Sequence, residues 1–409
     1  MTWAPAPQAE WVQEANRGER PEYRPDSAPF DGDRARADAE HRAGVTLDAP
    51  DVIDPLRVFC TALEAEADLT SLGRWATQRY LNRLLDVRLQ LDALAEAEPA
   101  IAEAPVVAPV FVIGAPRTGT TVMHRLLSVD PAHRVPEGWE FLWPAPPPET
   151  QTEADDPRIA LAADELGFPQ SVAEGLSSIH AYSARMPKEC LSAMALSFRT
   201  EEFVSRYHVP SYIDWLQQAD LAPAYTMHRW VLQVLQHRMP ARRWVLKSPV
   251  HLQGLPELMA TYPDARFVFT HREPAAVLAS VSSLIATLRS AFSANVDPMA
   301  IGRYHFDLYR RSLDDLVDHV DGGLIPAERA VHIGHRDVVA DPLRTLETVY
   351  DGLGLEFSAG VRDAAVAETN RRRPDALGAH SYEPDDFGLD PTEIDEGFGR
   401  YRHRFLEQP

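Results

Sequence analysis

Cysteine is scarce in this sequence. Its 409 residues include two cysteines, Cys60 and Cys190, which are too few for a disulfide framework or for a cluster of cysteine metal ligands. A fold that depends on such cross-links is therefore excluded. We interpret both thiols as small apolar side chains of the interior.

Long apolar runs and a basic amino-terminal region are also missing. The first residues, Met1 to Pro7, show no positive charge followed by an apolar stretch, so we predict no signal peptide. No uninterrupted apolar stretch reaches the length that a bilayer span requires. We therefore expect a cytoplasmic protein that does not insert into a membrane.

The sequence has fewer basic residues than acidic residues. The chain has 40 Lys and Arg residues against 61 Asp and Glu residues, which gives a formal net charge of −21. Such an acidic surface repels nucleic acid and anionic membranes, so we expect neither as a partner. Against this background, a local cluster of arginines indicates a site for an anionic ligand. The sequence leaves the oligomeric state open, a homo-oligomer included.

What the chain does contain is enough apolar material for a large core. Hydrophobic residues make up 45% of the sequence, and its length exceeds the usual limit for a single core. We predict a loosely structured arm over residues 1–45, a helical extension over 46–104 and an α/β domain over 105–409. Helical spacing of apolar residues predicts a helical insertion at about 150–240 within that domain.

Four short apolar runs predict buried strands. They lie at residues 106–113, 243–247, 265–270 and 330–333. Strands that alternate with helices form a mainly parallel sheet with helices on both faces, and ligands bind at the carboxyl ends of such strands. The predicted fold class is therefore α/β, with a P-loop-like parallel sheet of about five strands flanked by helices.

The first of these strands runs into the loop Gly114-Ala115-Pro116-Arg117-Thr118-Gly119-Thr120-Thr121. A glycine-rich loop between a strand and a helix presents backbone amides and a helix N-terminus to an anion. Thr120 stands where a P-loop nucleoside triphosphatase has its lysine, which argues against ATP chemistry. Arg117 instead supplies a cation that can bind a phosphate through two hydrogen bonds. Thr118, Thr120 and Thr121 add hydroxyl donors.

This loop resembles the 5′-phosphosulfate loop of sulfotransferases that use 3′-phosphoadenosine-5′-phosphosulfate, in the bacterial-type branch with the pattern Pro-Arg-Ser/Thr-Gly-Thr-Thr. Two further elements resemble that family and follow in its order. One is Lys247-Ser248-Pro249-Val250-His251, and the other is Arg272 with Ser280. The resemblance covers about residues 50–405 of the chain. It implies that donor as cosubstrate and adenosine 3′,5′-bisphosphate as product.

The resemblance also implies roles for these residues. Arg272 and Ser280, which are separated by about two helical turns, hold the 3′-phosphate of the donor. Lys247 stabilises the leaving phosphate oxygen, and His251 is suited to the role of base because an imidazole titrates near neutrality. The cations Arg117, Lys247 and Arg272 compensate the donor charge, so no metal is needed.

The identity of the base stays open at this point. Glu140 resembles a Trp-Glu element of the family and is the second candidate, while nearby Glu137 is a competitor. Other residues match the family without a defined role: His180, Glu189 and Cys190 in the helical insertion, and Arg371 to Arg373, which resemble a segment that folds back over the donor.

We therefore expect an enzyme that moves a sulfuryl group to a hydroxyl of a small organic acceptor, with an amine as the second choice. One alternative is a P-loop-type kinase of a small molecule or nucleotide, which Thr120 in place of lysine disfavours. The other is a non-catalytic nucleotide-binding protein, which the presence of Lys247 and His251 disfavours. The sequence does not identify the acceptor.

Overall fold

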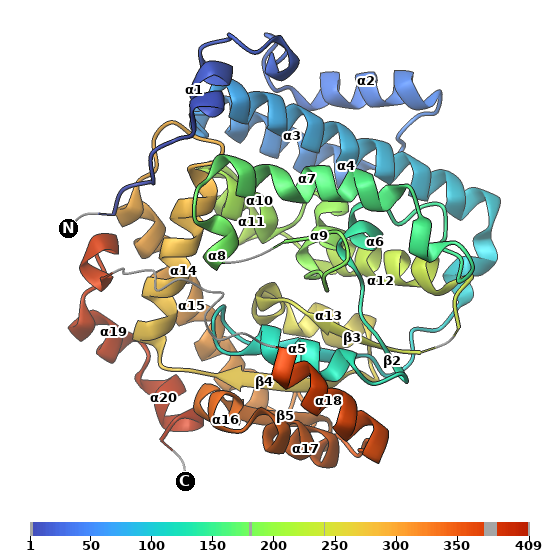
Figure 1. Cartoon of the computed structure of the whole chain (residues 1–409), viewed down its shortest axis with the longest axis vertical. Helices are drawn as coiled ribbons and strands as arrows, with labels where there is room; N and C mark the ends of the chain where they lie inside the picture. The colour runs from blue at the N-terminus through green and yellow to red at the C-terminus, as the bar shows by residue number, and fades with distance from the viewer. Residues whose placement is uncertain (1–2, 180–181, 241, 372–382, 408–409) are drawn as a thin grey trace.

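A five-stranded parallel sheet lies at the centre of the α/β part of the chain (Figure 1). In this computed structural model, which describes residues 3–179, 182–240, 242–371 and 383–407, the strand order is β2-β3-β1-β4-β5 and every neighbouring pair is parallel. The strands are β1 (Val110–Ile113), β2 (His133–Arg134), β3 (Arg243–Lys247), β4 (Arg266–His271) and β5 (Ala330–Gly334). The predicted α/β fold class is confirmed.

Four of the five strands coincide with the apolar runs that predicted them. The fifth, β2, has two residues, His133 and Arg134, which pair with Arg243 and Trp244 of β3. A strand of this length carries no detectable hydrophobic pattern, because alternation needs at least four residues to be recognised. It lies at the edge of the sheet and is recognised as a strand only through its pairing with β3.

The two faces of the sheet belong to two different cores. On β1, Val110 and Val112 lie in the core that also contains Val245, Val268 and the apolar side chains of the carboxyl-terminal helices. Phe111 and Ile113 lie in the larger core on the opposite face. A strand that is covered on both faces is apolar at every position, which explains why the sequence run is continuous.

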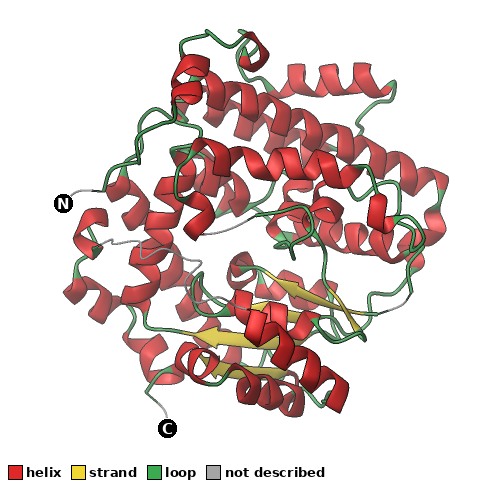
Figure 2. Ribbon diagram, in the orientation of Figure 1, coloured by secondary structure: helices red, strands yellow, loops and turns green. Residues whose placement is uncertain are grey.

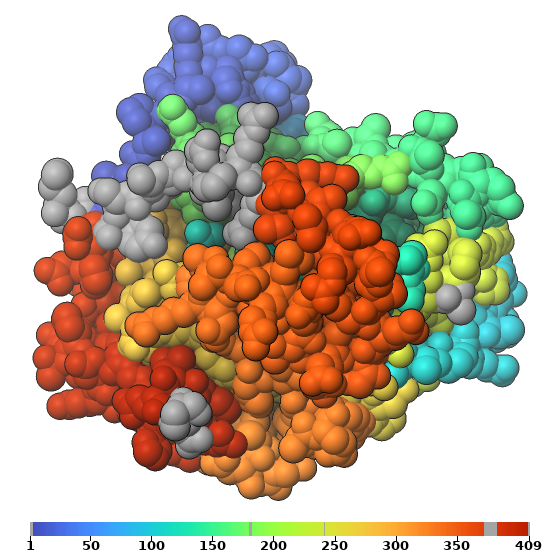
Figure 3. All heavy atoms as spheres, turned by 60° about the horizontal axis from the view of Figure 1, so that its bottom comes forward, coloured from blue at the N-terminus to red at the C-terminus, as the bar shows by residue number. Residues whose placement is uncertain are grey.

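The smaller core is covered by helices that follow β1 and β5 in the chain. These are α5 (Thr120–Ser128), α16 (His335–Ala340), α17 (Pro342–Gly352) and α18 (Ala359–Arg371). In the space-filling view of this side, the orange and red atoms of the carboxyl-terminal part of the chain cover most of the face (Figure 3).

The larger core is a thick helical body, in which helices far outweigh strands (Figure 2). Near the sheet it contains α12 (Ala222–Gln236), α13 (Leu255–Thr261), α14 (Pro274–Arg289) and α15 (Pro298–Asp321). Farther out lie α3 (Pro50–Glu66), α4 (Ser71–Ala97), α6 (Gly138–Leu142), α7 (Arg158–Val172), α8 (Leu176–Ile179), α9 (Leu191–Met194), α10 (Glu201–Arg206) and α11 (Pro210–Leu216). The chain ends with α19 (Pro391–Gly397) and α20 (Gly399–Phe405). None of the helices in the described ranges combines the length and the apolar character of a membrane span.

The amino-terminal stretch is more ordered than the sequence predicts. Residues 1–45, for which we predict a loosely structured arm, contain α1 (Glu10–Asn16) and α2 (Gly32–Ala43). Few residues of α2 are buried, so it lacks the apolar periodicity on which the prediction depended. The residues at its two ends are what define this helix. Asp31 caps the start by accepting a hydrogen bond from the Arg34 N–H, and Gly44 ends the helix in the left-handed conformation.

Both cysteines are free and fully buried, as we expected from their small number. Cys60 lies on α3, and Cys190 lies immediately before α9. Burial raises the pKa of both thiols. They are unreactive side chains of the interior rather than nucleophiles.

Candidate functional site

The predicted anion-binding loop joins β1 to α5 at the carboxyl edge of the sheet. Two of its residues have left-handed backbone, Arg117 at φ 70° and Gly119 at φ 100°. Gly119 is the residue before the first turn of α5, and no side chain in the described part of the chain caps that helix end. The first N–H groups of α5 are therefore left for a ligand, and the helix dipole favours an anion there.

Gly114 and two threonines fix the loop against β4. A Cβ atom on Gly114 would lie 2.2 Å from Thr270 Oγ1, so only glycine fits this close approach. Thr118 Oγ1 lies 2.5 Å from Thr270 Oγ1 and donates to the Ala115 carbonyl at 2.7 Å. The Thr118 side chain thus holds the loop together and is buried, as is that of Thr120, whereas Thr121 is exposed.

Two arginines meet beside this loop. Arg272 follows β4, and its Nη1 donates to the backbone carbonyl of Arg117 at 2.7 Å. Arg117 in turn donates from Nη1 to the Ile179 carbonyl at 3.3 Å. The structure thus brings the Arg272 side chain onto the backbone of the loop that carries Arg117. Ser280 lies two turns into the helix α14 that begins after Arg272, and its side chain is buried.

Lys247 reaches the same place from the end of β3. Its Nζ lies 2.5 Å from Glu189 Oε1 and 3.4 Å from Thr121 Oγ1. Glu189 precedes α9, and the next residue donates its backbone N–H to the Lys247 carbonyl at 3.1 Å. The Glu189 side chain is 19% exposed, so its carboxylate is partly accessible beside the loop.

In the sequence analysis, Glu189 matches the resembled family but has no assigned role. Its contact with Lys247 joins residues 58 apart in the chain, and no local pattern reports such a pairing. The segment Pro187-Lys188-Glu189-Cys190 was the available signal.

His251 lies deep in the core. It follows β3 in a short 3-10 helix, is 0% exposed and packs edge-on against the Phe111 ring at 5.1 Å between centroids. Its Nδ1 is 3.0 Å from the Tyr225 hydroxyl, and its Nε2 has no hydrogen-bond partner among the described residues. Burial, with His228 nearby, holds the pKa of His251 well below its usual range. This neutral, enclosed imidazole has no surface that an acceptor could touch.

Glu140 is engaged in local structure. Its Oε2 accepts the Glu137 backbone N–H at 2.8 Å, which completes a capping box at the start of α6. Its Oε1 forms a 2.5 Å ion pair with Arg134, and the residue is 5% exposed. Both carboxylate oxygens are thus occupied. Glu137 accepts from the Trp139 indole N–H at 2.7 Å, and burial raises its pKa.

The electrostatics around Lys247 also act on α5. His124 is buried on that helix, with Nε2 3.0 Å from the Val245 carbonyl. Burial and, next, the charge of Lys247 lower its pKa to about 4. His124 is therefore neutral at physiological pH.

Some predicted residues lie outside the described part of the chain. These are His180 and the segment 372–382, which includes two of the three arginines near the carboxyl terminus. Within the described ranges, no group of three or more His, Cys, Asp and Glu side chains is arranged to hold a metal ion.

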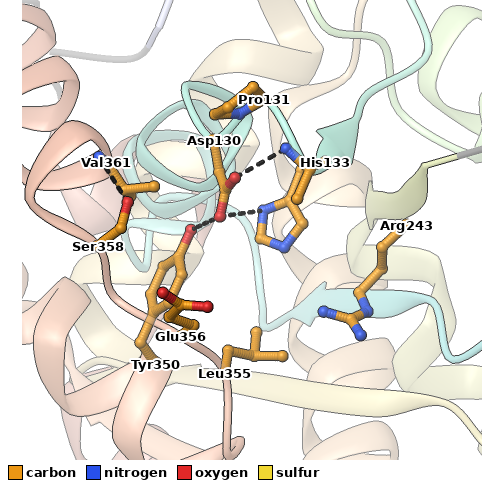
Figure 4. A pocket seen from close by; sticks show the side chains of 10 residues that line it. Asp130, Pro131, His133, Arg243, Tyr350, Leu355, Glu356, Ser358 and Val361 are labelled. Carbon is orange, nitrogen blue, oxygen red and sulfur yellow. Dashed lines mark hydrogen bonds and ion pairs between the residues drawn. The ribbon is translucent and has the colours of Figure 1, made fainter.

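A cavity of about 300 Å³ lies elsewhere (Figure 4). Asp130 and His133 line it before and within β2, and Arg243 lines it at the first residue of β3. The Tyr350 hydroxyl donates to Asp130 Oδ2 at 2.8 Å across its wall. Because the strands are parallel, their amino ends lie at the opposite edge from Gly114 and Arg272, so this cavity is separate from the candidate site.

Comparisons with known proteins find similarity to sulfotransferases in both sequence and fold. The family model described as "Sulfotransferase family" matches residues 109–359. The crystal structure of sulfotransferase STF1 from Mycobacterium tuberculosis H37Rv is 31% identical, with a TM-score of 0.77 over 90% of this chain and 97% of that one. Sulfotransferase STF9 from Mycobacterium avium is 26% identical, with a TM-score of 0.81 over 94% and 98%.

A curated relative adds a named acceptor. The omega-hydroxy-beta-dihydromenaquinone-9 sulfotransferase Stf3 of Mycobacterium bovis is 29% identical over 264 residues, which are 60% of this chain. The match spans 63% of the length of that relative.

Proposed function

Because the chain belongs to the sulfotransferase family, we propose that it transfers a sulfuryl group from 3′-phosphoadenosine-5′-phosphosulfate to a hydroxyl of a small organic acceptor. The observation that carries the proposal is that the Lys247 ammonium contacts both Glu189 and Thr121 beside the uncapped start of α5. A cation, a carboxylate and an anion site meet there, which are the groups that an in-line displacement at an activated sulfate requires.

The residues present fit the donor. The N–H groups at the start of α5 and the guanidinium of Arg117 suit the 5′-phosphosulfate. Arg272 and Ser280 are proposed for the 3′-phosphate, and Arg272 already lies against the loop through the Arg117 carbonyl. The bound donor supplies the sulfuryl group and, as leaving group, adenosine 3′,5′-bisphosphate.

We propose Glu189, rather than His251 or Glu140, as the general base. Its carboxylate takes the proton of the acceptor hydroxyl while the acceptor oxygen bonds to sulfur and the bond from sulfur to the bridging phosphate oxygen breaks. The Lys247 ammonium lies 2.5 Å from Glu189 and, close to Thr121, is placed to stabilise the negative charge on the leaving oxygen. In this proposal the two members of one ion pair share the work: Glu189 removes the proton and Lys247 stabilises the leaving oxygen.

The Stf3 relative supports a hydroxyl acceptor, because its name specifies an omega-hydroxylated dihydromenaquinone. An amine remains the second choice. A cytoplasmic location belongs to the same proposal, since the two cysteines are free thiols, as is usual in reducing compartments.

Calorimetry tests the proposal. Adenosine 3′,5′-bisphosphate should bind without magnesium. In a separate activity assay, the labelled sulfuryl group of the donor should appear on a hydroxylated acceptor from a screened set. ATP should bind poorly under the same conditions, because Thr120 replaces the P-loop lysine. A clear preference for magnesium-ATP would reject the sulfuryl-transfer assignment and favour a kinase.

A further inference from the structure

The turn that carries Arg272 is held by the helix α20. His271 ends β4, Arg272 and Glu273 lead into α14, and side chains of α20 contact His271 and Glu273 on either side of Arg272. Figure 1 shows α20 beside the end of β4, although more than 120 residues separate the two segments in the chain. The contact is therefore tertiary and specific to this turn.

The hydroxyl of Tyr401 is the centre of the contact. It lies 3.0 Å from Nδ1 of His271, the residue immediately before Arg272. His271 Nε2 in turn lies 2.9 Å from His332 Nδ1, so Tyr401, His271 and His332 form one continuous line of hydrogen bonds.

Two more contacts of α20 enclose the turn. The Phe405 ring stacks on His271 with 4.4 Å between centroids and an angle of 8°. Arg402 donates to Glu273 from Nε at 2.7 Å and from Nη2, and its Nη1 pairs with Asp395 at 2.7 Å. The Arg402 side chain is 16% exposed, whereas that of Glu273 is 47% exposed, so the arginine is packed against the turn and the carboxylate reaches solvent.

We propose that Tyr401 and Arg402 are positioning residues that set the affinity of Arg272 for the donor 3′-phosphate. Neither residue touches the donor in this proposal. They fix the backbone from which the Arg272 side chain reaches the loop, and a guanidinium that must form two hydrogen bonds is sensitive to small displacements of its backbone. The inference rests on the proposed function, since it requires that Arg272 binds that phosphate.

Binding of two nucleotides tests the proposal. Tyr401→Phe keeps the ring and removes the hydroxyl that is hydrogen-bonded to His271, the neighbour of Arg272. Its affinity for adenosine 3′,5′-bisphosphate should fall about three- to ten-fold, the effect of one lost hydrogen bond. Its affinity for adenosine 5′-monophosphate, which lacks the 3′-phosphate, should stay the same. A role confined to overall stability would weaken both nucleotides equally or neither.

Arg402→Gln provides the second variant, should Tyr401→Phe fail to fold. Its matched control is Arg400→Gln, which lies on the same helix and loses an ion pair with Asp318 that does not involve the turn. We expect the selective loss for Arg402→Gln and not for Arg400→Gln. In steady-state assays the loss should raise the KM for the donor and leave kcat unchanged.

Arg272→Ala, measured in parallel, distinguishes the binding role of Arg272 from the positioning role of Tyr401 and Arg402. A selective loss of the bisphosphate in Arg272→Ala, without one in Tyr401→Phe and Arg402→Gln, would overturn the positioning role and leave the function intact. Equal losses of both nucleotides in Arg272→Ala would instead reject Arg272 as the 3′-phosphate ligand, and the positioning role with it.

Discussion

At the scale of single residues, the ion pair between Lys247 and Glu189 distinguishes this site from a generic phosphate loop. The sequence identified the lysine from its place at the end of a strand. It could not identify the partner, because the contact is made by a segment from the helical insertion that folds back onto β3. A strand end and its loop are local features, whereas this pair depends on the tertiary arrangement.

Replacing Glu189 tests the assignment of the base. Glu189→Gln keeps the size of the side chain and removes its basicity, so kcat should fall about 100- to 10,000-fold. Affinity for adenosine 3′,5′-bisphosphate should change by less than a factor of about five, since the anion site itself is intact. Rapid-quench measurement with labelled donor and calorimetry give the two quantities.

Glu137→Gln is the matched control, because it removes another partly buried carboxylate without touching Lys247. Its kcat should match that of the unchanged enzyme. Should Glu189→Gln turn over normally while His251→Ala is inactive and still folded, the base would be His251, and an opening of the core around Phe111 would be required.

For His251, the sequence motif gives the position of the residue in the chain but not the direction of its side chain. The pattern Lys-x-Pro-x-His places a histidine four residues after the lysine, but it does not say which side of the chain faces the site. In the short 3-10 helix that follows β3, that side faces Phe111 and Tyr225. Which side is buried depends on helices that enter from elsewhere in the chain.

At the scale of elements, α10 begins with two adjacent glutamates in opposite electrostatic environments. Burial raises the pKa of Glu201 to about 7, although Tyr304 donates to its Oε2 at 2.6 Å. Burial opposes ionisation of Glu202 as well, but Arg206 and Lys188 outweigh it and lower that pKa to about 2. One helix turn therefore responds to pH in two different ranges.

Glu201 should make the protein less stable as the pH rises. Its folded-state pKa of about 7 lies above the ordinary value of 4.5, so the folded state holds this proton more tightly and stability is lost between those two values. Glu201→Gln removes the loss. The variant should gain on the order of 1–3 kcal/mol relative to the unchanged protein between pH 5 and pH 8.

Urea unfolding at several pH values measures this difference. Subtracting the two stability curves cancels every group that titrates identically in both proteins. Parallel curves for variant and unchanged protein would show that Glu201 ionises normally and that its surroundings are more hydrated than the burial indicates.

The elements that the sequence missed are those with little hydrophobic contrast. β2 is too short for alternation, and α2 is mostly polar around its circumference, so end signals rather than periodicity define it. By contrast α3, α4 and the four longer strands bury regular apolar sets, and their positions followed from the sequence. Burial of a repeated pattern is what makes an element predictable.

At the scale of the whole molecule, one core joins parts that the sequence suggested were separate. The larger core contains Val12 of α1, Leu84 of α4 and Phe267 of β4, and it continues to Tyr401 of α20. A division at residues 45 and 104 follows changes of composition and remains a prediction. The apolar contacts cross both of those positions.

This continuity predicts one cooperative unfolding transition. Helices that share a core with the sheet lose their apolar contacts when the sheet unfolds, so the amino-terminal helices should not melt separately. Differential scanning calorimetry should show a single peak, and circular dichroism and tryptophan fluorescence should give the same midpoint. A distinct transition at lower temperature, assigned to residues 1–104 by limited proteolysis, would contradict it.

The insertion between β2 and β3 has a consequence for how such an enzyme can change. The proposed donor contacts stand on the loops after β1 and β4, whereas Glu189 and the helices around it belong to that insertion. Under the proposed roles, the segment around Glu189 could change with the acceptor while the loops after β1 and β4 keep the donor contacts. Such an exchange has to keep two contacts with the rest of the site, the carboxylate beside Lys247 and the Ile179 carbonyl that accepts from Arg117.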